Sequence, residues 1–177
     1  MKRPARALLF LLLAGCSCGA PHPKVVGDCA SRTDPVPTEV WDHRTNGSPI
    51  VWNHNPPASG PHYFFWARYQ RHSAEVPVGY WLHNVEHGAV VLLYRPEVPS
   101  EQIAALASVY DALPNDPNCG HRLALMTADS TLPTPIAAVA ANFVLSSQCV
   151  DADALDAFVA AHRGHGPEVA CADGSYP

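Results

Sequence analysis

Residues 89–94 form an unbroken apolar run of strand length (AVVLLY). A run without polar alternation predicts a central strand that is buried on both faces of a sheet. Residues 100–113 then carry apolar side chains at helical spacing behind a serine and an acidic residue, which predicts an amphipathic helix with a serine cap. Residues 151–163 have acids in the first turn and end with His162 and Arg163, and therefore predict a second helix.

Other segments give weaker patterns. Residues 122–127 are typical of a second strand and residues 136–145 of a third, although the alanines in the latter also allow a helix. Residues 40–80 are rich in proline and aromatic side chains, and their prolines exclude long helices. We expect an ordered loop layer there, with a short helix around residues 63–71.

The order strand, helix, strand, strand, helix predicts an α/β or α+β fold. We expect a single compact domain over residues 39–177, with a small mixed sheet covered by helices and by the proline- and aromatic-rich layer. A thioredoxin-like arrangement fits this order. The chain has no CxxC motif, so this arrangement carries no inference of redox activity.

Residues 1–15 are typical of a bacterial export signal, with three basic residues ahead of a short apolar stretch that cannot span a bilayer. Leu13-Ala14-Gly15-Cys16 matches the lipoprotein cleavage motif and predicts lipidation at Cys16. The alternative is an ordinary signal peptide cleaved near Ala20. With lipidation, residues 16–38 form a tether, and the protein lies in the cell envelope, anchored to the outer membrane or facing the periplasm.

The charge of the chain restricts its partners. It carries 11 basic and 16 acidic residues, and removing Lys2, Arg3 and Arg6 with the signal leaves a net charge of about −8 with histidine neutral. Nothing here resembles a basic nucleic-acid footprint, whereas cations, metal ions included, are attracted. The membrane is a partner through the lipid anchor, and the sequence identifies no protein partner.

Export also bears on the cysteines. In an oxidising compartment the four that follow the tether's Cys18 are expected to form disulfides. We predict pairing of Cys119 with Cys149, because each flanks a predicted strand, and of Cys29 with Cys171, which joins the two ends of the domain.

Two dense motifs stand out: NPPASGPHY at residues 55–63 and HNVEHG at residues 83–88. At these motifs the chain resembles the bacterial family called domain of unknown function 3105. The resemblance extends weakly through the apolar run, the helix after it and Gly166-Pro167-Glu168. The family name implies no activity, so function has to come from the residues.

The two motifs and the residues beside them supply a set of possible metal ligands: His54, His62, His83, Glu86 and His87. Imidazole and carboxylate bind borderline divalent ions, so we predict a site for zinc or copper(II), formed in a loop that leads into the strand. Copper(I) is disfavoured because it prefers soft sulfur ligands. The other histidines, His43 among them, receive no assignment.

Two alternatives stay open. The motif HxxEH formally matches an inverted zinc-protease pattern, but that mechanism needs a helix, and Gly88 with the apolar run behind it argues against one. A small metal- or histidine-dependent envelope enzyme would use Glu86 as its catalytic residue, and an open coordination position beside it would favour that class. A non-catalytic interaction domain would instead use the histidines to hold loops through backbone carbonyls.

Overall fold

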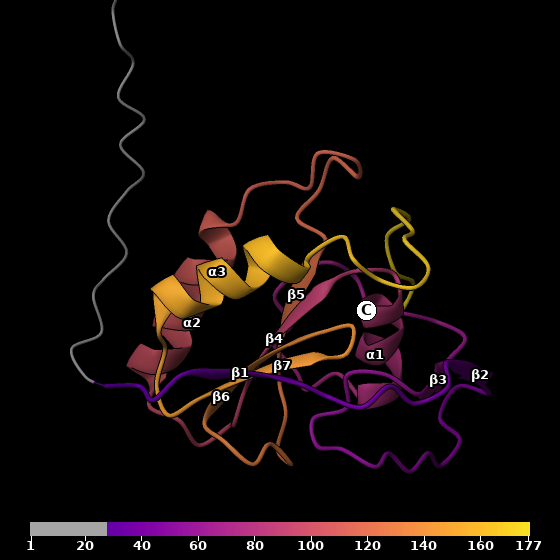
Figure 1. The fold of residues 1–177 in the computed structure, drawn as a ribbon, viewed down its shortest axis with the longest axis horizontal. Coiled ribbons are helices and arrows are strands. Elements are labelled where there is room, and N and C mark those ends of the chain that lie inside the picture. The colour runs from indigo at the N-terminus through magenta and orange to yellow at the C-terminus, as the bar shows by residue number, and fades with distance from the viewer. Residues whose placement is uncertain (1–27) are drawn as a thin grey trace, which may run out of the picture.

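A computed structural model describes residues 28–177, so the expected signal peptide and Cys16 lie outside the described residues. Seven strands and three helices make up the described part of the chain (Figure 1). In chain order they are β1 (Arg32–Pro35), β2 (Asp42–Arg44), β3 (Pro61–Tyr63), α1 (Val78–Glu86), β4 (Val90–Tyr94), α2 (Ser100–Ala112), β5 (Ala124–Ala128), β6 (Ile136–Ala140), β7 (Phe143–Ser147) and α3 (Ala152–His162).

The main sheet has the strand order β1-β7-β6-β4-β5, and β2 pairs with β3 in a separate parallel ribbon. Strand β4 is parallel to β5 and antiparallel to β6, so the sheet is mixed. This α/β domain is the predicted class, and its strand order is compatible with a thioredoxin-like arrangement. Residues 28–38, which we assigned to the tether, include β1 at the edge of the sheet.

Alternate side chains of β4 enter two separate cores, which is why this strand is apolar throughout. Val90 and Leu92 pack with α2 and α3 in one core. Val91 and Leu93 pack on the other face with α1 and with the loop layer. Figure 1 shows α2 and α3 side by side on one face of the sheet and α1 apart from them, next to β2 and β3. No helix in residues 28–177 is long and apolar enough to cross a membrane.

Three sequence-based expectations about local structure outside the HNVEHG motif were wrong. Residues 63–71 form no helix, whereas residues 78–86 form α1. Residues 136–145 are not one strand but parts of the hairpin β6–β7, which turns at Asn142 with a φ of 65°. The predicted serine cap of α2 is also absent, since Pro99 takes the N-cap position and no side chain caps it.

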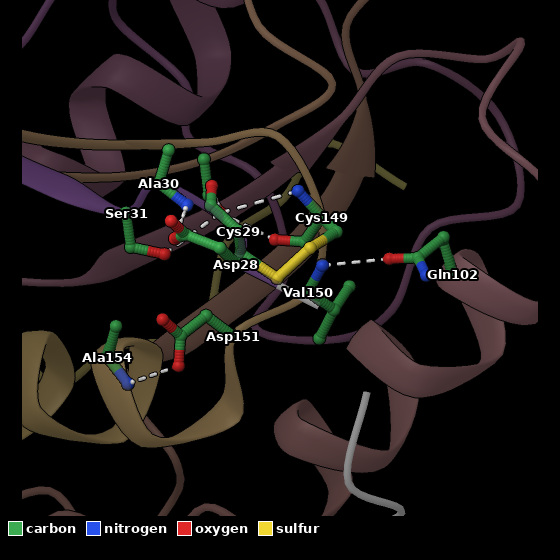
Figure 2. Close-up of a disulfide and its surroundings, with 10 residues drawn as sticks. Asp28, Cys29, Ala30, Ser31, Gln102, Cys149, Val150, Asp151 and Ala154 are labelled. Atoms are coloured by element: carbon green, nitrogen blue, oxygen red, sulfur yellow. Dashed lines mark hydrogen bonds between the residues drawn. A yellow bond between two sulfur atoms is a disulfide. The ribbon is translucent and has the colours of Figure 1, made fainter. Parts of the chain in front are cut away.

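The disulfides join the four predicted cysteines, but not in the predicted pairs. Cys29 pairs with Cys149, and Cys119 pairs with Cys171. The reason for the first pair is β1, which runs antiparallel to β7 and so brings the residues before it next to those after β7. Figure 2 shows this disulfide between the start of β1 and the start of α3, with Asp151 capping α3 through the backbone N–H of Ala154. The predicted pairs Cys119–Cys149 and Cys29–Cys171 were therefore wrong.

Candidate metal centre

Helix α1 presents His83, Glu86 and His87 on one face, at the spacing i, i+3, i+4. The helix ends in a Schellman motif, in which the N–H groups of Gly88 and Ala89 donate to the carbonyls of Val85 and Asn84. Gly88 has a φ of 85°, which suits glycine after a helix. The expectation of a loop here was therefore wrong, because the glycine terminates a helix that includes the motif.

The ribbon of β2 and β3 carries two further histidines toward this face. His43 and His62 are direct partners in its parallel register, and their ring centroids lie 4.6 Å apart. The residues of the first motif fix this ribbon: Ser59 Oγ accepts the N–H of Glu39 just ahead of β2, and Gly60 O lies 2.9 Å from His62 Nδ1. The contact of the Ser59 hydroxyl explains the serine, and a φ of 118° at Gly60, in the range that favours glycine, explains the glycine.

Four side chains bring their ligand atoms together. One donor atom each from His43, His62, His83 and Glu86 lies within 4.8 Å of all the others. Glu86 Oε2 is 3.0 Å from His62 Nε2 and 3.8 Å from the Nε2 atoms of both His43 and His83. The Nε2 atoms of His43 and His83 are 3.4 Å apart. Such a cluster of imidazoles around a carboxylate can hold a metal ion.

The hydrogen bonds of His62 and His83 determine which nitrogen of each ring is free to bind a metal ion. Nδ1 of His62 lies 2.9 Å from Gly60 O, and Nδ1 of His83 lies 2.7 Å from Tyr63 O. A carbonyl only accepts, so each Nδ1 carries the proton and donates it. In the neutral rings both Nε2 atoms then present lone pairs to the cluster. Metal-ligating histidines are commonly oriented in this way by a carbonyl on the other nitrogen.

Several polar atoms of the cluster are unsatisfied among the described residues. His62 Nε2 and Glu86 Oε2 have no hydrogen-bond partner there, although they are only 3.0 Å apart. His62 is completely buried and Glu86 is 6% exposed. Leaving a buried polar group unsatisfied costs about 1–3 kcal/mol, so the arrangement favours a ligand between these atoms.

The fifth residue of the motif, His87, lies beside this group. Its Nε2 is 3.1 Å from that of His83, and it forms a second cluster with Glu86 and Glu168. Of the five residues in the predicted ligand set, the structure brings His62, His83, Glu86 and His87 together. His54 is partly exposed and belongs to neither cluster, and His43 lies where a fourth histidine was expected.

Aromatic rings cover the site. Trp66 contacts His83 and His87, with ring centroids 4.9 and 4.7 Å apart. Phe64 stacks on His43 at 5.4 Å. The side chain of His43 is nevertheless 38% exposed, against 4% for His83, so solvent reaches the cluster from the side of His43.

Burial and neighbouring groups lower the pKa values of three residues at the site, His83, Glu86 and His87. Burial, together with the neighbouring His87 and His62, lowers the pKa of His83 to about 3. Burial alone would raise the pKa of Glu86, but His62, His83 and His43 beside it together outweigh burial, and that pKa is also lowered. Burial likewise lowers the pKa of His87, despite Glu86 and Glu168. A neutral imidazole and an ionised carboxylate are the forms that bind metal.

The low pKa of His83 predicts acid sensitivity of the metal-free domain. An unfolded histidine titrates near 6.5, so between that pH and about 3 the unfolded chain holds the additional proton at this residue. In that window the free energy of unfolding should decrease as the pH is lowered, by up to about 1.4 kcal/mol per pH unit for this residue alone. Urea unfolding in chelator at pH 7 and pH 5 measures the loss. The variant His83→Gln should show a shallower dependence, and equal slopes for both proteins would contradict the assignment.

Comparison with known families identifies the family of the chain. Residues 43–174 match a family model described as "Protein of unknown function (DUF3105)". The match covers well over half of the chain, so the protein belongs to this family, and the resemblance drawn from the sequence is confirmed. The matched range includes all residues of both clusters, from His43 to Glu168. No curated protein and no solved structure matches the chain.

Proposed function

We propose that this member of a family of unknown function binds a divalent transition-metal ion, zinc in preference to copper(II), through His43, His62, His83 and Glu86. The observation that carries the proposal is the convergence of three imidazoles and a carboxylate, three of these four side chains being buried. All four described cysteines are in disulfides, so imidazole and carboxylate are the ligands that this part of the chain offers. These ligands suit zinc and copper(II).

The spacing of the donors favours zinc. Zinc bonds of about 2.0–2.1 Å place any two donors of a tetrahedron about 3.3–3.4 Å apart. Four of the six distances between the donor atoms, at 3.0, 3.4 and twice 3.8 Å, scatter around this value, and all six are within 4.8 Å. A square-planar copper(II) ion would instead need opposite donors about 4.0 Å apart and neighbours about 2.8 Å apart. Four protein ligands would complete a tetrahedral shell, which supports a role in holding the ion.

A zinc titration of the purified, chelator-treated protein tests this function. We expect a tight first equivalent, measured by calorimetry against a competing chelator. His62→Ala should weaken that equivalent about 100-fold or more, since even residues that merely orient metal ligands are worth 10–100-fold. His54→Ala is the matched control, because His54 lies in the adjoining segment but outside the cluster, and it should leave the affinity unchanged. Absence of a tight zinc equivalent in the parent protein would refute the proposal.

An enzymatic role is the second candidate. It is supported by the exposure of His43, the one ligand at the edge of the cluster, because an exchangeable ligand could give way to a substrate. It is also supported by the helical placement of HxxEH, which the protease pattern requires. In such an enzyme Glu86 would act on a bound water rather than complete the metal shell.

We also propose that the protein is a lipid-anchored protein of the cell envelope. The lipoprotein motif supports this, and so does the pairing of four cysteines in disulfides, which are typical of oxidising compartments. Replacement Cys16→Ser should leave the protein unprocessed or released from the membrane fraction, as measured by fractionation and intact mass. Unchanged mass and membrane association in that variant would contradict lipidation.

A further inference from the structure

Glu86 belongs to two groups of possible metal ligands. Beside its cluster with His43, His62 and His83, it lies in a second group with His87 and Glu168, in which one ligand atom of each residue is within 4.8 Å of the others. Among the residues that the structure describes, it is the one side chain common to both groups. A carboxylate has two oxygens and can therefore serve two ions at once.

His87 supplies independent evidence for a ligand in the second group. It is 4% exposed, and its Nδ1 has no hydrogen-bond partner among residues 28–177. Its Nε2 is already 3.1 Å from His83 Nε2, so Nδ1 is the atom left without an interaction. A buried nitrogen without a partner is costly, and a cation would satisfy its lone pair.

The chain holds Glu168 at this position through its backbone. Glu168 N donates to Glu86 O at 3.1 Å. Two residues earlier, Gly166 passes so close to the end of α1 that a Cβ there would lie 2.2 Å from Glu86 O and 2.3 Å from Gly88 N. The disulfide Cys119–Cys171 ties down the same segment three residues later. The Gly-Pro-Glu sequence thus presents a carboxylate to α1, a role that the first metal position leaves unexplained.

We propose that Glu86, His87 and Glu168 form a second divalent-cation position, and that the Glu86 carboxylate bridges the two ions. This rests on the proposed metal-binding function and extends it. The second position has three protein ligands, which leaves a coordination place for water or substrate, as in catalytic metal sites. Paired ions about 3.5–4 Å apart are the arrangement of many hydrolytic two-metal enzymes. Occupancy of both positions therefore favours an enzyme over a storage or delivery role.

Titration of the chelator-treated protein with Co²⁺ tests the second position, with elemental analysis for the number of ions and visible absorption for each step. The parent protein should bind two ions in two steps. The Glu168→Gln variant should bind one ion, with an affinity that differs less than about twofold from that of the first step in the parent protein. Glu168 is exposed, so this replacement does not threaten the fold. Glu101→Gln, at an exposed acid of α2, should still bind two.

The outcomes separate this inference from the function on which it rests. One ion in the parent protein, lost on replacement of His62, would overturn the second position and leave the first intact. Two ions in Glu168→Gln with unchanged affinities would also overturn it. Binding of no ion by the parent protein would refute both positions.

Discussion

Replacing His83 with alanine should abolish the rise in melting temperature that zinc confers on the protein. An ion present at 100 times its dissociation constant stabilises the folded state by about 2.7 kcal/mol, which in a domain of this size corresponds to about 5–10 °C. His83 contributes Nε2 to the cluster, 3.4 Å from Nε2 of His43 and 3.8 Å from Oε2 of Glu86. Differential scanning calorimetry with chelator and with zinc measures the shift directly.

Measuring the melting temperature both in chelator and in zinc distinguishes a metal ligand from a histidine that only holds a loop in place. His83→Ala also removes the hydrogen bond to Tyr63 O, so it should lower the melting temperature in chelator as well. A purely structural histidine would produce that loss alone, and zinc would still stabilise the variant as it stabilises the parent. His54→Ala should retain the full zinc effect. A normal zinc shift in His83→Ala would exclude this residue as a ligand.

Replacing Gly166 with alanine should destabilise the domain by about 3 kcal/mol and weaken metal binding. The added Cβ would lie 2.2 Å from Glu86 O and 2.3 Å from Gly88 N, and these are backbone atoms that cannot rotate away. Overpacked sites usually cost about 1–3 kcal/mol, and a backbone clash belongs at the upper end. Displacing this segment would also move Glu168 away from Glu86. Chemical unfolding together with a metal titration measures both effects.

A second glycine provides the control for backbone strain. Gly47 has a φ of 78°, and a Cβ added there would meet no atom within 4 Å, so Gly47→Ala tests conformational cost without a clash. That variant should lose about 1 kcal/mol and bind metal normally. If Gly166→Ala reduced the free energy of unfolding and the metal affinity no more than Gly47→Ala, the close packing of residues 166–168 on α1 would not be important for the centre.

The elements with strong periodicity could be predicted from the sequence. Strand β4 and helices α2 and α3 occur where the apolar pattern placed them, because their side chains face cores that run along the whole element. The hairpin β6–β7 was predicted as one strand, since its turn is made by Asn142 in a left-handed conformation instead of by glycine or proline. A local pattern carries little sign of such a turn.

Helix α1 was not predicted because its sequence lacks the usual features of a helix start. It begins after Pro77 with a valine and a glycine, and no side chain caps it. Its glycine at position 79 is required instead by Tyr63, whose ring carbons would lie 2.6 Å from an added Cβ. Trp81, Leu82 and Val85 are completely buried, so tertiary packing determines this helix more than propensity. Gly88 could have been recognised as a helix stop signal.

The sequence predicted part of the ligand set but missed His43, and the position of His43 in the fold shows why. A single motif contains His83, Glu86 and His87 close together in the sequence, so they could be recognised as possible ligands. His43 stands alone in the sequence and enters only because β2 pairs with β3, in a register that no local pattern encodes. The disulfides also depend on strand pairing, since the pairing of Cys29 with Cys149 follows from the β1–β7 contact.

X-ray absorption at the zinc edge, on protein loaded with one equivalent of zinc, tests the central claim most directly. We expect a four-coordinate ion with three imidazole nitrogens and one carboxylate oxygen at about 2.0–2.1 Å. His43→Ala should lose one imidazole contribution from that spectrum, and His54→Ala should lose none. A six-coordinate shell of water oxygens, or an imidazole count that does not change in His43→Ala, would contradict the proposed centre.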